Sequence, residues 1–378
     1  MVIKMTNTIG ATSVLERPPA RDYWPTVDWK TSSPEAQGLS TAVLDGIITG
    51  FAADTLPALS GVVVVRHGYL VYEQYFNGFH KKSLHSLYSV SKSFMSALVG
   101  VALKQGLLSS VDQRLMDFFP ELDGLDVDPR VRTITLHHLL SMTSGWDKKT
   151  ELPIEIRCKV QSEPGFVEAS LLRPMVNEPG AVFAYDSQAM HLLSTVIGKV
   201  AGMKSSAFAA ESLMKPLGIW QEPSPKFQWR TNEQGPHHWF YQPLFDEESG
   251  RPWMVDANGD ALGWTGLHLT LRDMAKFGYL YLNGGMWNGT ELIPADYVSA
   301  SATPHSTGGP GPEPTVTPYG YLWWVPKSDT GMFHGWGAGR QFIYVIPGLD
   351  MVVAVTARHV RNDSGRVIDR FILPAVNS

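Results

Sequence analysis

The segment 87–103, LYSVSKSFMSALVGVAL, constrains the fold of this chain more than any other part of the sequence. From Phe94 to Leu103 its residues are apolar on nearly every side, which is the pattern of a helix buried all round rather than along one face. Gly106 follows at a position where the end of a helix is expected. The sequence therefore predicts a buried helix that begins at or near Ser89.

The first turn of this predicted helix carries Ser89 and Lys92. Ser89 would lie at the positive end of the helix, where free N–H groups stabilise developing negative charge. Lys92 is three residues further on and shares a face with Ser89, one turn away. A serine hydroxyl is a weak nucleophile that needs a base beside it. A lysine desolvated in a cleft favours the neutral form that accepts a proton. The pair is a candidate nucleophile and general base.

A second copy of the Ser-x-x-Lys pattern occurs at Ser212 and Lys215. The pattern is short, and either copy taken alone is more often part of a helix surface than a catalytic pair. Ser89 opens a helix that is too apolar for a surface, whereas Ser212 stands late in a helical pattern that ends at Pro216-Leu217-Gly218. The context therefore favours Ser89 as the nucleophile.

The composition is that of a globular protein with one large domain or two interlocked ones. Hydrophobic residues make up 44% of the 378 residues, and the formal net charge is −5. This mild acidity gives no reason to expect nucleic acid or a membrane surface as a partner. The single cysteine, Cys158, excludes an internal disulfide and is interpreted as structural. The N-terminal segment has no apolar core of signal-peptide length, and no run anywhere reaches the length of a membrane span, so we expect a cytoplasmic protein.

Periodicity predicts a mixture of helices and strands along the chain. We expect helices at 43–51, 112–119, 134–142, 191–200, 271–285 and 367–373, and strands at 61–76 (a hairpin around His67-Gly68), 320–325, 339–347 and 351–356. Residues 219–264 are irregular and are predicted to form a functional loop or lid. Its aromatic residues either fill a core or roof the active-site groove: Trp220, Trp229, Trp239, Phe240, Tyr241 and Trp253.

The adjacent His137 and His138 invite a metal-binding interpretation, which we do not favour. Neighbouring side chains on a helix point about 100° apart and do not easily hold one ion. The sequence contains no His-Glu-x-x-His pattern, no Gly-x-Ser-x-Gly elbow and no glycine-rich phosphate loop. We therefore expect ordinary polar histidines, no metal and no cofactor.

Taken together, several blocks of the sequence resemble the serine β-lactamase-like family. This family includes class C β-lactamases, D-alanyl-D-alanine carboxypeptidases, family VIII carboxylesterases and 6-aminohexanoate-dimer hydrolase. The resemblance extends from about Trp29 to Thr356. The blocks are SPEAQGLS, YSVSKSF, ITLHHLLSMTSGW, PGAVFAYDSQAMHLLSTVIGKVAG, KPLGIW, GLHLTLRDMAKFGYLYLNGG, YGYLWWV and FHGWGAGRQFIYVIPG.

The resemblance implies an α/β (α+β) fold, with an antiparallel sheet flanked by helices and an inserted all-helical domain. Residues 1–78 and 265–378 would form the sheet domain, and residues 79–264 the mainly helical domain, which includes the aromatic-rich loop at 219–264. The active site would lie in the groove between the two.

The resemblance also implies the catalytic residues. Ser89 and Lys92 match the family's Ser-x-x-Lys motif, and Tyr185 matches the tyrosine of its Tyr-x-Asn motif. Ser187 stands where the asparagine of that motif is expected. Its hydroxyl still offers a hydrogen bond to the substrate or to the lysine.

The family's third motif, Lys or His followed by Thr or Ser and Gly, aligns with Phe333-His334-Gly335. In this register the backbone N–H groups of Trp336 and Ser89 form the oxyanion hole, and His334 and Gly335 border the substrate. A shift by one residue would make Gly337 the donor instead of Trp336. In either register the lysine that recognises a substrate carboxylate is missing, which argues against a true β-lactamase.

These residues predict a serine hydrolase that cleaves an ester or amide through an acyl-enzyme, most readily a carboxylesterase or small-amide hydrolase. The alternatives are a β-lactamase or D-alanyl-D-alanine carboxypeptidase, and a non-catalytic binding or scaffold member of the family. The presence of the complete set Ser89, Lys92 and Tyr185 argues against the non-catalytic alternative. We expect a small-molecule substrate, no nucleic acid or membrane partner and no cofactor; the oligomeric state stays open.

Overall fold

Five strands from the two ends of the chain form one antiparallel sheet. The computed structural model describes residues 19–152, 165–219, 253–256, 258–310, 316–358 and 367–376. The strand order is β2-β1-β11-β10-β9. The strands are β1 (Leu59–Arg66), β2 (Tyr69–Tyr75), β9 (Phe333–Gly337), β10 (Gln341–Ile346) and β11 (Met351–Ala357). The predicted hairpin turn is confirmed at His67 and Gly68, whose φ angles of 51° and 87° suit a tight connection.

Both faces of the sheet are buried, and successive residues of each strand contribute to opposite faces. Val63 and Val65 of β1 belong to the larger core, which includes α3 (Ser91–Lys104) and α9 (Leu271–Leu282). Val62 and Val64 belong to a second core with α1 (Thr41–Leu44), α2 (Gly46–Ala52) and the C-terminal turn η12 (Ile368–Ile372). Double burial explains why Val62–Val65 of β1 form a continuous apolar run rather than an alternating pattern.

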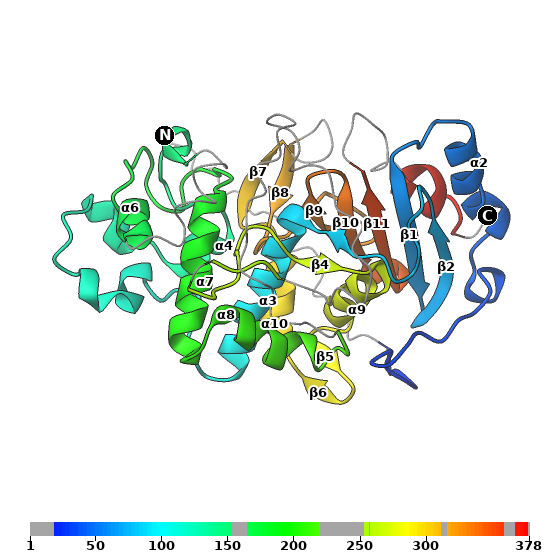
Figure 1. Cartoon of the computed structure of the whole chain (residues 1–378), viewed down its shortest axis with the longest axis horizontal. Coiled ribbons are helices and arrows are strands. Elements are labelled where there is room, and N and C mark those ends of the chain that lie inside the picture. Colours follow the sequence, from blue (N-terminus) through cyan, green and yellow to red (C-terminus); the bar gives the residue numbers. More distant parts are fainter. Residues whose placement is uncertain are drawn as a thin grey trace, which may run out of the picture.

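The remaining helices lie mostly on the side of the molecule away from β1 and β2, and α3 runs between them and the sheet (Figure 1). The α-helices among them are α4 (Leu136–Leu140), α6 (Phe166–Leu171), α7 (Ser187–Ala201), α8 (Ser205–Ala209) and α10 (Ala295–Ser301). The other short 3₁₀ and π turns are η1 (Glu35–Gln37), η2 (Tyr88–Val90), η3 (Leu115–Phe118), η4 (Pro120–Leu122), η5 (Pro129–Thr133), η6 (Lys148–Thr150), η7 (Ala210–Met214) and η10 (Pro347–Leu349). Short strand pairs complete the fold: β3 (His85–Ser86) with β4 (His268–Leu269), β5 (Met286–Trp287) with β6 (Thr290–Glu291), and β7 (Ser306–Pro310) with β8 (Val316–Tyr319). The division into domains at 79 and 265 stays a prediction.

The strand predicted at 320–325 is wrong. The chain turns there instead: Leu322 has a positive φ of 61°, and its amide donates to the carbonyl of Leu140 at 3.0 Å. Trp324 forms isolated bridges to Tyr319 and His334 rather than a continuous ladder. These tertiary contacts override the β propensity of the aromatic run.

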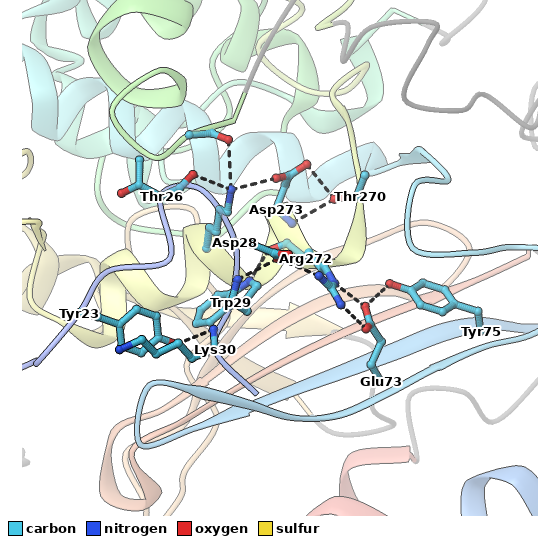
Figure 2. A network of polar contacts seen from close by, with 12 residues as sticks. Tyr23, Thr26, Asp28, Trp29, Lys30, Glu73, Tyr75, Thr270, Arg272 and Asp273 are labelled. Carbon is cyan, nitrogen blue, oxygen red and sulfur yellow. Dashed lines mark hydrogen bonds and ion pairs between the residues drawn. The ribbon is translucent and has the colours of Figure 1, made fainter. Parts of the chain in front are cut away.

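The network in Figure 2 fastens the start of α9 to the sheet and to the N-terminal segment. Arg272 donates to both carboxylate oxygens of Glu73 on β2, at 2.8 and 2.7 Å, and to Asp28 at 2.7 Å. Thr270 caps α9 as predicted, because its side chain accepts a hydrogen bond from the amide of Asp273. These contacts fix the start of α9, and with it the end of the preceding loop, relative to the sheet.

No helix within the described ranges is both long and apolar enough to cross a membrane.

Candidate active site

Ser89 and Lys92 meet at the start of α3. Ser89 lies in the turn η2, which leads directly into α3, so the predicted helix start is close to the observed one. Lys92 Nζ donates to Ser89 Oγ at 3.0 Å. Lys92 is buried with 1% of its surface exposed, whereas Ser89 is partly exposed. The hydroxyl therefore remains accessible to a substrate while the amine beside it is shielded from water.

A backbone carbonyl provides a second partner for Lys92. Its Nζ donates to the carbonyl oxygen of Trp264 at 3.0 Å. The residue before Trp264 is Gly263, where an added Cβ would stand 2.0 Å from the carbonyl oxygen of Met190 in α7. Only glycine permits so close an approach, so the backbone next to Trp264 packs directly against α7 and this contact positions the Trp264 carbonyl. Sequence analysis missed Trp264 because a backbone carbonyl has no sequence signature.

The segment that carries Trp264 is also joined by hydrogen bonds to the region around η2, the turn that contains Ser89. The carbonyl of Leu267 accepts a hydrogen bond from the amide of Leu87 at 2.8 Å, and the amide of Leu267 donates to Ser91 Oγ at 3.3 Å. The short pair of β3 and β4 continues this contact. The loop before α9 and the start of α3 therefore form one hydrogen-bonded unit.

The ring of Tyr185 lies over Lys92. The distance from Lys92 Nζ to the ring centroid is 4.9 Å. The ring is parallel to that of Trp324, with centroids 6.2 Å apart and an interplanar angle of 12°, and it meets Tyr319 edge-on at 6.4 Å. The structure thus brings the side chains of Ser89, Lys92 and Tyr185 together around a single nitrogen, Lys92 Nζ.

Strand β9 passes directly beside η2, the turn that contains Ser89. A Cβ added to Gly337 would stand 2.2 Å from the carbonyl oxygen of Leu87 and 3.2 Å from the amide nitrogen of Ser89. A Cβ added to Gly335 would stand 2.9 Å from Ser93 Oγ. The two glycines of this strand therefore leave room for neighbours that approach the backbone closely: the Leu87–Ser89 backbone at Gly337 and the Ser93 side chain of α3 at Gly335.

The backbone directions along β9 identify the candidates for the second oxyanion donor. His334 exchanges both backbone hydrogen bonds with Trp324, each at 2.9 Å, so its amide points away from β10. Amide directions alternate along a strand, so the amide of Trp336 also points away from β10 and that of Gly337 points towards it. This geometry favours Trp336 over Gly337. Ala338, on the other side of Gly337, is a further candidate that the motif alignment missed.

The side chain of His334 lies on the opposite face of the sheet from the site. Its ring packs 5.9 Å from that of Phe342 and 5.2 Å from that of Tyr344, and the residue is 1% exposed. Burial lowers the pKa of His334 to about 3. Gly335, the next residue, faces Ser93 and α3 instead. The imidazole of His334 therefore does not face Ser89, contrary to the expectation that this side chain borders the substrate.

Ser187 is the first residue of α7, and its amide donates to the carboxylate of Glu151 at 3.0 Å.

Trp253 does not roof a groove, contrary to one expectation. It is 2% exposed, and its indole nitrogen donates to the carbonyls of Leu262 and Thr265, both at 3.1 Å. Trp253 is therefore a core residue. The other aromatic residues expected in the roof, at 220–241, lie outside the described residues.

The adjacent histidines on α4 have separate local partners. His137 Nδ1 lies 2.9 Å from the hydroxyl of Tyr321, and His138 Nδ1 accepts from the amide of Thr135 at 3.1 Å. In the part of the chain that the structure describes, no cluster of three or more His, Cys, Asp or Glu residues could hold a metal ion.

Sequence comparison identifies the family. The Beta-lactamase family model matches residues 45–377, so the chain belongs to the β-lactamase family, whose members are serine hydrolases. An uncharacterized protein of Alkalihalophilus pseudofirmus is 24% identical over 251 residues, which is 64% of this chain. The match spans 60% of that relative's own length.

Comparison with solved structures confirms the fold class. A family VIII carboxylesterase superposes with a TM-score of 0.66 at 16% identity, over 91% of this chain and 98% of the other. EstCE1, a hydrolase with promiscuous acyltransferase activity, gives 0.65 at 18% identity, over 91% and 99%. The octameric penicillin-binding protein homologue from Pyrococcus abyssi gives 0.65 at 19% identity, over 89% and 77%. At such identities the likeness establishes the fold and leaves the substrate open.

Proposed function

We propose that this protein hydrolyses esters or small amides through an acyl-enzyme on Ser89. The observation that carries the proposal is the 3.0 Å contact between Lys92 Nζ and Ser89 Oγ, made by a lysine that is 1% exposed. The Tyr185 ring, 4.9 Å from the same nitrogen, supplies a phenol for acid–base chemistry. Nucleophile, base and acid are the parts that acyl transfer requires.

In the proposed mechanism, Lys92, assisted by the Tyr185 phenol, removes the proton from Ser89 Oγ as the oxygen attacks the carbonyl carbon. The amide of Ser89 and the outward amide of Trp336, or the amide of Ala338, hold the oxyanion. One such donor typically contributes about 3–4 kcal/mol in the transition state. Tyr185 then gives its proton to the leaving oxygen or nitrogen and takes up the proton that Lys92 removed from Ser89, and water cleaves the acyl-enzyme with the same groups in reverse roles.

We further propose a preference for uncharged acyl groups over β-lactams. The side of β9 that faces α3 offers no cation in the described structure: Phe333 is fully buried against Trp323, and Gly335 and Gly337 have no side chain. The walls beside Tyr185 are the aromatic rings of Trp324 and Tyr319. Aromatic walls favour apolar burial, at ~25 cal/mol per Å².

Two measurements test this function. A fluorophosphonate probe followed by peptide mass spectrometry should give a covalent adduct on Ser89; the absence of an adduct and of any turnover would identify a non-catalytic member of the family. A panel of p-nitrophenyl esters, short amides and cephalosporins should give the highest kcat/KM for a short-chain ester. If a β-lactam had the highest value, the preference would be wrong, and Arg340 on the β9–β10 turn would be the first cation to examine.

A further inference from the structure

Backbone conformations that are unfavourable for ordinary side chains occur at several places around the site. Tyr88, Met142, Leu322 and Arg340 have φ angles of 47°, 58°, 61° and 67°. The other non-glycine residues with positive φ in the described ranges are Asp, Asn or His, which adopt this conformation more readily. Tyr88 precedes the nucleophile, the carbonyl of Leu322 accepts from Ser93 Oγ, and Arg340 follows β9. Strained residues of this kind often mark a functional requirement.

Met142 is the one of these four that contacts both neighbours of Tyr185. Its carbonyl oxygen accepts a hydrogen bond from the amide of Ala184 at 2.8 Å. Its thioether sulfur accepts from the amide of Asp186 at 3.3 Å. Met142 is 1% exposed, so water does not compete for either contact. A single residue thus holds the backbone on both sides of Tyr185.

The other contacts of this segment fix Asp186. One carboxylate oxygen accepts from Arg173 at 2.6 Å, and the other accepts from the amide of Ala189 at 3.0 Å and so caps α7. These bonds hold the carboxylate, whereas the direction of the peptide that leads into Asp186 depends on the Met142 sulfur. The Tyr185 ring projects from between the two Met142 contacts towards Lys92.

We propose that Met142 is a positioning residue for Tyr185: its carbonyl oxygen and its sulfur accept hydrogen bonds from the amides of Ala184 and Asp186, the residues on either side of Tyr185, and this sets the ring over Lys92. The inference rests on the proposed acid–base role of Tyr185. The carbonyl alone would hold the chain before Tyr185 and leave the Tyr185–Asp186 peptide without this contact. Misplacement of a catalytic group by about 1 Å can lower the rate by about 10²-fold.

A double-mutant cycle tests this role with a short-chain ester as the substrate. Met142→Leu keeps the volume and removes the sulfur acceptor; Met116→Leu makes the same change at a buried methionine of η3 and serves as the control. We expect Met142→Leu to lower kcat about 10-fold with little change in KM, and Met116→Leu to leave both near wild type. In a Tyr185→Phe background, Met142→Leu should lower kcat by less than about twofold, because the group it positions is gone.

Met142→Gln provides the rescue, because a glutamine of similar length can present an amide oxygen to the Asp186 N–H. It should recover part of the activity that Met142→Leu loses. An unchanged kcat in Met142→Leu, or an equal loss in both backgrounds, would overturn the inference and leave the role of Tyr185 intact. If Tyr185→Phe itself kept full activity, the acid–base role and the inference would fall together. Circular dichroism and the thermal midpoint of each variant identify a folding defect, and a loss in Met142→Leu that Gln does not rescue counts against the proposal.

Discussion

The two copies of Ser-x-x-Lys in this chain have the same spacing and opposite surroundings. At the first copy, Lys92 is 1% exposed and its Nζ lies 3.0 Å from Ser89 Oγ. At the second, Ser212 lies in the turn η7, and the side chain of Lys215 is 63% exposed. Lys215 pairs at 3.0 Å with Glu211, one turn before it, and not with the serine.

The difference lies in what surrounds each pair. Around Ser89, a carbonyl from residue 264, the ring of Tyr185 and strand β9 converge on one turn. Around Lys215, solvent and a neighbouring carboxylate satisfy the charge. A buried amine that touches a hydroxyl can exchange a proton with it, whereas an exposed ammonium ion paired with a carboxylate remains charged.

Replacement of the serines should give the largest contrast. Ser89→Ala removes the proposed nucleophile and should lower ester hydrolysis by roughly 10⁴-fold or more. Ser212→Ala should leave kcat/KM near wild type. Steady-state kinetics with p-nitrophenyl esters measure both. Equal losses in the two variants would mean that the surroundings do not distinguish the copies.

The lysines allow the same comparison at the base. Lys92→Met keeps the length of the side chain and removes the amine, so turnover should fall by at least ~10²-fold. Lys215→Met changes an exposed side chain and should alter kcat by less than about twofold. A fully active Lys92→Met enzyme would contradict the assignment of the base.

Tyr185→Phe removes the phenol and keeps the ring stacked on Trp324. We expect a loss of roughly 10²–10⁴-fold in kcat, with the thermal midpoint close to wild type. This variant tests whether the first copy needs a third group in addition to its serine and lysine. Near-normal turnover would move the acid–base role to another residue.

His334 provides the contrast to Tyr185, because it is close in sequence to the third motif but faces away from the site. Burial lowers the pKa of His334 to about 3, against about 6.5 for an exposed histidine. Between these pH values the unfolded chain binds a proton that the folded chain does not. The free energy of unfolding therefore falls as the pH drops from about 6.5 towards 3, by at most ~1.4 kcal/mol per pH unit from this group.

The variant His334→Leu should consequently retain ester hydrolysis within a few fold and unfold at a lower pH than wild type. Activity at pH 7 and acid unfolding followed by tryptophan fluorescence are the two measurements. A loss comparable to that of Tyr185→Phe would assign the imidazole a role that its position does not support.

The smallest effect is expected from the ion pair at the second copy. Glu211→Gln breaks an exposed i,i+4 pair, which typically contributes ~0.3–0.5 kcal/mol to the free energy of unfolding. Urea unfolding at low and high salt should detect a change of this size that disappears as salt rises. A change several times larger would show that the second copy is more than a solvated helix surface.

The sequence was most informative where a structure depends only on residues that are close together in the chain. The buried helix, the hairpin around His67 and the cap at Thr270 each follow from neighbouring residues, and the Ser89–Lys92 contact needs one helical turn. The family resemblance, now supported by the match over residues 45–377, supplied the fold class and the position of Tyr185.

What the sequence could not provide were contacts made by backbone atoms and choices between the two faces of a strand. The carbonyl of Trp264 reaches Lys92 because Gly263 packs against α7, and no local pattern signals that approach. His334 faces Tyr344 because successive side chains of β9 point to opposite faces of the sheet. A shift of the register by one residue would reverse the face on which each side chain lies. Trp253 belongs to a segment whose aromatic composition suggested a lid. It is a core residue, and its indole N–H donates to two backbone carbonyls.

The sheet pairs residues from opposite ends of the chain, with Val62 of β1 beside Val355 of β11, and this has a consequence for biosynthesis. The turn that carries Ser89 is translated well before β9, whose backbone lies against it. We therefore expect the growing chain to hold the Ser89 segment without this neighbour until β9 has left the ribosome. Pairing over so long a loop is slow compared with local helix formation. The edge of β1 that later pairs with β11 has no partner during this time, and it is the part of the nascent chain that most needs protection from aggregation.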